Sequence, residues 1–170
     1  VVRAAQVARA HGATVILNPA PACPLPPELL SLVDVLIPNE SETALLTHLP
    51  VGDWAEIEVA ASALRELCVD TVVLTLGEQG ALLVEKGEKE LVPAFEVTPV
   101  DTTAAGDAFV GGFAVALAEG RSLVDAVRWG NAAGALATTR LGAQPSLPAR
   151  RAVEALMAQV STDSLAGGNA

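Results

Sequence analysis

The sequence predicts an α/β fold, in which a mainly parallel sheet carries helices on both faces. Short, continuous apolar runs at 14–17, 33–37 and 71–76 have the pattern of strands buried on both faces. They alternate with helical segments, as in parallel α/β proteins. Apolar residues make up 51% of the 170 residues, which is enough for a packed core. We expect one domain over residues 1–160 and a disordered tail over 161–170.

The remaining elements follow from periodicity and from turn residues. Asp53 can cap the helix that follows it, and Lys86-Gly87 is expected to join two strands of a hairpin. Residues 97–100 are expected to form a strand that leads into Asp101. The predicted helices cover 1–10, 26–32, 40–49, 54–67, 105–119, 123–139 and 148–160.

Charge and cysteine content exclude several classes of protein. The formal net charge is -10 with no cluster of Lys and Arg, so we expect neither nucleic-acid nor membrane binding. Cys23 and Cys68 are isolated, which predicts buried or half-buried thiols without a disulfide partner and a cytoplasmic location. The chain begins at Val1 directly in a helical pattern, which indicates an incomplete gene product.

The segment from Asp101 to Asp107, Asp-Thr-Thr-Ala-Ala-Gly-Asp, carries the clearest chemistry. Its small residues Ala104, Ala105 and Gly106 leave backbone N–H groups uncovered at the start of a helix, which forms an anion hole. Beside such a hole, the Asp107 carboxylate could take a proton from a hydroxyl that attacks phosphorus. The alternative is ordinary capping, with Asp101 or Thr102 as N-cap and Asp107 as a first-turn acid.

Together with four further motifs, this segment resembles the ribokinase, or PfkB, family of sugar kinases. The motifs follow one another in the family's order over residues 1 to about 157. The further motifs are Asn18-Pro19-Ala20-Pro21, Pro38-Asn39-Glu40-Ser41-Glu42, Thr75-Leu76-Gly77-Glu78-Gln79-Gly80 and Thr139-Arg140-Leu141-Gly142-Ala143-Gln144-Pro145-Ser146.

The resemblance assigns a role to each motif. It implies that Asp107 is the catalytic base and binds the sugar, and that Ala104, Ala105 and Gly106 form the anion hole. Without the resemblance, residues 75–80 are a Gly-rich turn, Glu42 a solvated helix carboxylate and Asn131 a helix residue facing solvent. The implied nucleotide-binding residues are Asn39, Glu42, Thr75, Leu76, Gly77, Glu78, Gln79, Gly80, Gly106, Asp107 and Asn131, with Glu42 acting through magnesium-bound water.

The resemblance also implies a potassium site near the anion hole. One carboxylate with several carbonyl and hydroxyl oxygens suits a weakly hydrated cation, and the alternative for Arg140 is a cation at a helix C-terminus. The implied positions are Asp101, Thr103, Ala137, Arg140, Gly142 and Ser146.

The implied reaction is the transfer of phosphate from ATP to O5 of D-ribose, with Mg²⁺ and K⁺ as cofactors. The resemblance further implies a homodimer for the intact protein, and it places the N-terminal strands, the lid and most of the sugar pocket outside this chain. Two alternatives stay open: a non-catalytic nucleotide-binding module, or a kinase for another sugar.

Overall fold

The structure of the protein is a computed structural model that describes residues 1–67 and 69–166. The prediction for Cys68 lies outside the described residues. Cys23 is a free thiol, but the predicted burial is wrong for it, because it lies exposed in an irregular segment before the helix at 27–30. The chain divides into two compact units. Unit 1 comprises 1–76 with 81–91, and unit 2 comprises 77–80 with the residues from Val92 onward.

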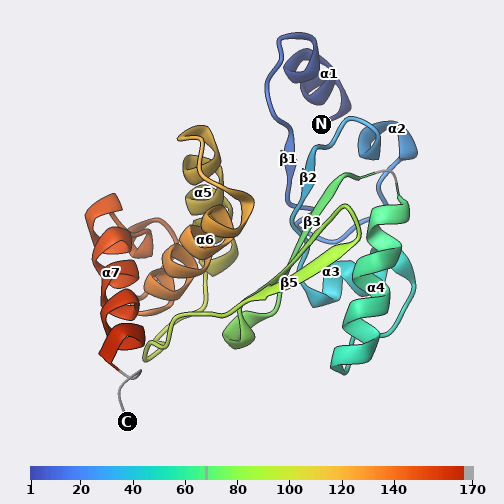
Figure 1. The fold of residues 1–170 in the computed structure, drawn as a ribbon. Coiled ribbons are helices and arrows are strands. Elements are labelled where there is room, and N and C mark those ends of the chain that lie inside the picture. The colour runs from blue at the N-terminus through green and yellow to red at the C-terminus, as the bar shows by residue number, and fades with distance from the viewer. Residues whose placement is uncertain (68, 167–170) are drawn as a thin grey trace. The chain divides into compact units, whose positions relative to one another are not determined.

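A mixed sheet with the strand order β1-β2-β3-β4-β5 crosses unit 1 (Figure 1). β1 pairs with β2 and β2 with β3 in parallel, whereas β3 and β4 are antiparallel. The hairpin predicted around Lys86-Gly87 is confirmed, and so is the α/β class. The strands are β1 Ile16–Leu17, β2 Val35–Leu36, β3 Thr71–Thr75, β4 Ala81–Glu85 and β5 Glu88–Val92.

The helices of unit 1 lie close to their predicted positions. The Asp53 side chain accepts a hydrogen bond from Glu56 N and caps α4, as predicted. α4 packs on β3 and β4, where its Ile57 and Leu64 join Val72 and Leu74 in one apolar cluster. The helices are α1 Val2–Ala10, α2 Pro27–Leu30, α3 Glu40–Thr47 and α4 Trp54–Glu66.

Unit 2 is helical, and its core lies between α5 and α6. The rings of Phe109 and Phe113 stack with their centroids 6.4 Å apart, and Phe113 is fully buried. The elements are the 3₁₀ turns η1 Gly77–Gln79 and η2 Gln144–Ser146, with the helices α5 Ala105–Ala118, α6 Leu123–Thr138 and α7 Arg150–Ala166.

Alanine substitutions at two neighbouring glycines of α5 are expected to have opposite effects on stability. A Cβ at Gly112 would lie 2.9 Å from both Ala133 Cβ and Trp129 O of α6, whereas a Cβ at Gly111 would meet nothing within 4 Å. Gly112→Ala is therefore expected to lower the free energy of unfolding by about 1–3 kcal/mol, because the two helices must move apart. Gly111→Ala is expected to raise it by about 0.5–1 kcal/mol. Urea unfolding of both variants checks this, and equal effects would contradict the close packing of α5 on α6.

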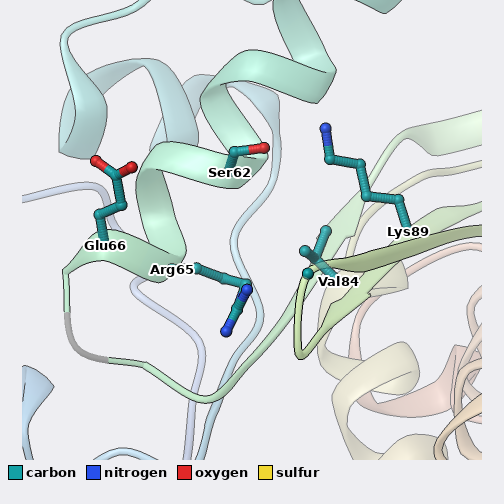
Figure 2. A pocket seen from close by; sticks show the side chains of 6 residues that line it. Ser62, Arg65, Glu66, Val84 and Lys89 are labelled. Atoms are coloured by element: carbon teal, nitrogen blue, oxygen red, sulfur yellow. The ribbon is translucent and has the colours of Figure 1, made fainter.

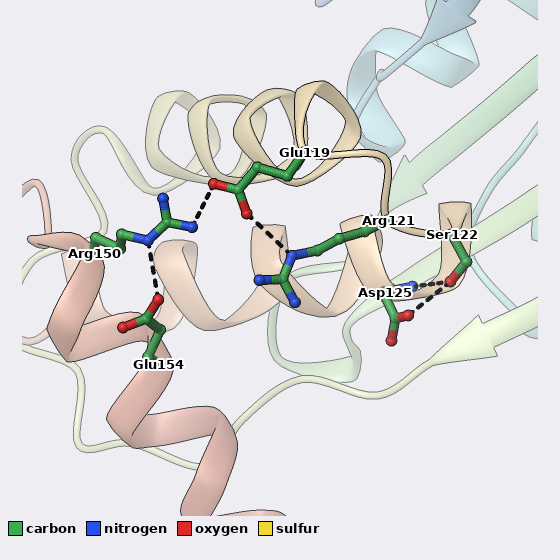
Figure 3. Close-up of polar contacts among 6 residues, drawn as sticks. All are labelled: Glu119, Arg121, Ser122, Asp125, Arg150 and Glu154. Atoms are coloured by element: carbon green, nitrogen blue, oxygen red, sulfur yellow. Dashed lines mark hydrogen bonds and ion pairs between the residues drawn. The ribbon is translucent and has the colours of Figure 1, made fainter.

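An ion-pair network joins α7 to the end of α5 (Figure 3). Glu119 accepts hydrogen bonds from Arg150 and Arg121, and both guanidinium groups lie over the ring of Trp129, at 4.5 Å and 5.4 Å from its centroid. Hydrogen bonding to Arg150 is the main cause that holds the pKa of the Glu119 carboxyl below its usual value. The network fixes α7 over the buried indole ring.

Two predicted elements differ from the structure. The strand expected at 97–100 is absent, because Pro99 has no N–H to donate to a sheet and the N–H of Val100 bonds to Thr138 O at the end of α6. α7 continues to Ala166, six residues into the tail predicted for 161–170, whose last four residues lie outside the described part. The single-domain prediction for 1–160 stays a prediction.

Candidate active site

In unit 2, the N-terminus of α5 presents free backbone donors. The N-cap residue is Ala104, which holds a left-handed backbone with φ 60° and makes no side-chain cap. Among the described residues, no acceptor bonds to the N–H groups of Gly106 and Asp107, and both residues are exposed. A left-handed non-glycine residue costs about 1–2 kcal/mol, so the turn is strained where it exposes these donors. Capping by Asp101 or Thr102 is therefore wrong.

Asp101 instead joins two loops of unit 2. Its Oδ1 accepts from Thr103 N at 2.9 Å, and its Oδ2 accepts from Gly142 N at 2.8 Å. Hydrogen bonding to Thr103 and to Gly142 lowers the pKa of the Asp101 carboxyl below its usual 3.8. A carboxyl group whose pKa is lowered by folding stabilises the folded state fully at pH values above its unfolded pKa. That stabilisation is lost only as the pH falls through the lowered, folded-state pKa. The two loops therefore stay joined at neutral pH.

The C-terminal end of α6 holds the start of the same segment. Thr138 O accepts hydrogen bonds from Val100 N at 2.7 Å and from Asp101 N at 3.0 Å. Ser146 is buried, and its hydroxyl donates to Ala143 O at 2.7 Å. Of the predicted potassium-site residues, the structure thus brings Asp101, Thr103 and Gly142 into direct contact. Thr138 was missed because a backbone carbonyl leaves no mark in the sequence.

Asn131 of α6 forms hydrogen bonds to the chain at the C-terminal end of β5. Its Nδ2 donates to Val92 O at 2.9 Å and to Pro93 O at 3.0 Å, and the residue is only 7% exposed. The alternative of a solvent-facing helix residue is wrong. A Cβ at Gly80, where φ is 106°, would lie 2.2 Å from Val92 O. Asn131 and Gly80 of the predicted nucleotide site therefore contact the same strand end.

Replacement of Asn131 tests this anchoring. Asn131→Ala leaves two backbone carbonyls without their donor, which is expected to lower the free energy of unfolding by about 1–3 kcal/mol. Asn131→Asp is expected to cost more, because it puts a carboxylate beside those carbonyl oxygens. Chemical unfolding gives both values, and a loss below about 0.5 kcal/mol in the alanine variant would contradict the anchoring role.

In unit 1, Asn39 and Glu42 form a reciprocal cap at the start of α3. Asn39 Oδ1 accepts from Glu42 N at 2.9 Å, and Glu42 Oε2 accepts from Asn39 N at 2.8 Å. Glu42 is only 4% exposed, so the solvated-carboxylate alternative is wrong. This capping box accounts for the spacing of the two residues. Their ligand-binding roles stay predictions.

The strand ends of unit 1 bring three polar residues to one edge of the sheet. Asn39 and Thr75 form a parallel bridge next to the sheet, where Thr75 N donates to Pro38 O at 2.9 Å. Asn18 Nδ2 donates to Ile37 O at 2.8 Å, which ties the loop after β1 to the end of β2. Ligands of open α/β sheets bind at this carboxyl edge. The Asn-Pro pair that ends β1 is what indicated in the sequence that Asn18 lies in a loop at this edge.

The described residues hold no group of three or more His, Cys, Asp or Glu side chains that could bind a metal ion. No helix within residues 1–67 and 69–166 is long and apolar enough to span a bilayer.

Comparison with known proteins assigns the chain to a family. Residues 1–150 match the pfkB family of carbohydrate kinases, and the chain belongs to that family. It is 46% identical to the ribokinase of Haemophilus influenzae over 148 residues, which cover 87% of this chain and 48% of that protein. It is 41% identical to the ribokinase of Staphylococcus aureus over 149 residues, which cover 87% of this chain and 49% of that protein.

Solved structures show the same relationship. The Arabidopsis thaliana ribokinase in complex with ribose and ATP matches with a TM-score of 0.86 and 36% identity, over 92% of this chain and 51% of that chain. The Thermotoga maritima ribokinase matches with a TM-score of 0.81 and 45% identity, over 91% of this chain and 52% of that chain. The ribokinase-like fold is thereby confirmed, and the chain spans about half the length of these relatives.

Proposed function

We propose that the full-length protein carrying this chain phosphorylates D-ribose at O5 with ATP. The observation that carries the proposal is the turn at the start of α5, where free N–H groups of Gly106 and Asp107 stand beside an exposed carboxylate. The similarity to a ribokinase that was solved with ribose and ATP supports both substrates.

The geometry of the α5 turn supports specific roles in the reaction. Asp107 accepts the proton of the sugar hydroxyl as that oxygen attacks the γ-phosphorus. The N–H groups of Gly106 and Asp107, with the helix dipole behind them, stabilise the negative charge that develops on the transferred phosphoryl group. A carboxylate in this position repels a phosphate unless it is protonated during the reaction, which favours catalysis over mere nucleotide binding.

Magnesium would shield the charge of the ATP phosphates and is bound mainly by the phosphates themselves. Glu42 contributes through a water molecule in this proposal. Its Oε2 closes the capping box with Asn39 N, which holds the carboxylate in one orientation. The remaining nucleotide contacts are proposed for residues 75–80 and Asn131.

Potassium fits the surroundings of Asp101. The Asp101 N–H bonds to Thr138 O at the C-terminal end of α6, so its carboxylate is close to the negative end of a helix dipole. A monovalent cation relieves this repulsion. The proposed ligands are the Asp101 carboxylate, with oxygens of Thr103, Ala137, Arg140, Gly142 and Ser146.

We therefore expect potassium to raise the rate of ribose phosphorylation, and sodium to raise it less. The cation orders the loop bearing Asp101, and that loop leads directly into the anion-binding turn. Initial rates in potassium, sodium and tetramethylammonium chloride at one ionic strength measure the effect. Equal rates in the three salts would refute the site.

The proposed activity is tested by product analysis. The full-length protein, ATP, MgCl₂ and KCl are incubated with D-ribose, 2-deoxyribose, D-fructose or no sugar, and the products are identified by ³¹P NMR. Preference for ribose with formation of the 5-phosphate supports the proposal. Preference for another sugar supports a related kinase, and ATP binding without transfer supports the non-catalytic alternative. A homodimer and a cytoplasmic location stay predictions.

A further inference from the structure

A basic pocket lies between α4 and the β4–β5 hairpin of unit 1 (Figure 2). Its volume is about 300 Å³, and it is lined by Ser62, Arg65, Glu66, Val84, Gly87 and Lys89. This volume is at the lower end of the range for small-molecule sites. Since a water molecule takes up about 30 Å³ of liquid, the pocket offers space for roughly ten waters or one small organic ion.

The two cations of the basic pocket are not neutralised by protein carboxylates. Among the described residues, neither Arg65 nor Lys89 makes an ion pair; Lys89 Nζ donates to the backbone oxygen of Glu58 at 3.0 Å. The Nε of Arg65 is buried with no hydrogen-bond partner. In Figure 2 the Glu66 carboxylate points away from the Arg65 guanidinium. Arg65 as a whole is half-buried, so its guanidinium charge is partly desolvated, and an anion in the pocket would neutralise that charge.

A purely structural role explains less of this arrangement. Arg65 lies in the last turn of α4, where a cation is favoured by the helix dipole. That position accounts for a positive charge, but not for a second cation in the same pocket. The hairpin turn itself accounts for Gly87, whose φ is 93°, and a Cβ there would lie 3.8 Å from Arg65 Nη1, at van der Waals distance. In a protein of net charge -10, two unneutralised cations in one pocket indicate an anionic ligand.

The basic pocket is separate from the carboxyl edge of the sheet. Val84 in its wall pairs with Val72 near the start of β3, whereas Thr75 at the end of β3 bridges to Asn39. Three residues of a strand span roughly 10 Å. A ligand bound here would therefore act at a distance from the proposed nucleotide edge.

We propose that the basic pocket binds a dianionic phosphate group, either as inorganic phosphate or as a small phosphate monoester. The planar Arg65 guanidinium group provides two parallel N–H donors, which match the oxygens of phosphate. The Lys89 ammonium group and the Ser62 hydroxyl group supply a further charge and a further donor. This proposal is independent of the proposed kinase activity.

Titration by NMR tests the site in the protein itself. The backbone amide of Gly87 is followed while potassium phosphate is added, against potassium chloride of equal ionic strength, and ribose 5-phosphate and D-ribose are added in parallel titrations. We expect a saturable shift with phosphate, with ribose 5-phosphate or with both, and none with chloride or ribose. A shift with the ester alone would identify a monoester as the ligand. A phosphate and ester response that is linear and equal to that of chloride would overturn the proposal.

Three variants test which side chains cause the phosphate-dependent shift. Arg65→Gln is expected to weaken phosphate binding at least about tenfold, because a charge-assisted bidentate contact is lost. Lys89→Gln is expected to weaken phosphate binding several-fold. Because Lys89 is exposed, this substitution is not expected to disturb folding. Lys86→Gln is the control: Lys86 pairs with Glu85 in the same hairpin and does not line the pocket. Unchanged binding in Lys89→Gln, or equal weakening in Lys86→Gln, would contradict the site even if Arg65→Gln failed to fold.

Discussion

Asp107→Asn in the full-length protein is expected to lower kcat for ribose phosphorylation by about 10²–10⁴, the usual contribution of a general base. The amide cannot take the proton from the sugar hydroxyl, while the free N–H groups of the α5 turn remain. The dissociation constant for ATP should therefore change little. Rapid-quench kinetics for the rate and calorimetry for ATP binding separate the two effects.

Asp125→Asn provides a matched control for that experiment. Asp125 stands three residues after the N-cap Ser122 of α6, just as Asp107 stands three residues after the N-cap Ala104 of α5. Both variants lose an interaction with a helix dipole, worth about 0.3–1 kcal/mol, and Asp125→Asn also alters the hydrogen bond that Asp125 Oδ2 accepts from Ser122 Oγ. Only Asp107→Asn should slow phosphoryl transfer. Similar kcat values for Asp107→Asn and the unchanged protein would rule out the role of base.

Gly106→Ala is expected to separate stability from activity. A Cβ at Gly106 would meet no atom within 4 Å, so we expect no loss of folding stability and a gain of up to about 1 kcal/mol. The methyl group would occupy space beside the free N–H donors, where the phosphoryl group is proposed to bind. Loss of one such donor typically costs about 10²–10³ in kcat, and we expect a decrease of at least about tenfold here.

Gly111→Ala is the control for this second variant. It adds the same methyl group to the same helix, also in open space, but more than one turn away from the N-terminus of α5. Both variants should unfold at equal or higher urea concentration than the unchanged protein, and only Gly106→Ala should lose activity. Full activity in Gly106→Ala would contradict the anion hole.

Helices and the α4 cap were predictable from local patterns, because capping and apolar periodicity act within a few residues. The hairpin at Lys86-Gly87 and the strands at 71–75 and 81–85 followed for the same reason. The strand expected at 97–100 did not form, because Pro99 has no N–H to donate and the N–H of Val100 bonds to Thr138 O at the end of α6. Such distant pairings leave no local pattern.

The candidate site shows the same limit. The composition of the segment from Asp101 to Asp107 predicts donors at Ala104, Ala105 and Gly106 beside a carboxylate. In the structure the N–H of Ala105 bonds to Thr102 O at 3.2 Å, and the free, exposed donors are those of Gly106 and Asp107. Their role as an anion hole stays a prediction. The sequence could not show that Asp101 binds Gly142 N, or that Asn131 is buried against Val92 and Pro93. The identity of these partners depends on how α6 packs, and packing is a property of the whole unit.

We propose that this chain supplies the base and the anion hole of a ribose kinase. The most direct test compares the full-length protein with its Asp107→Asn variant in single-turnover transfer from [γ-³²P]ATP to D-ribose. We expect labelled ribose 5-phosphate from the full-length protein and a rate at least about 10²-fold lower in the variant, with ATP bound by both. Equal transfer rates in the two proteins, or no transfer to ribose in either, would contradict it.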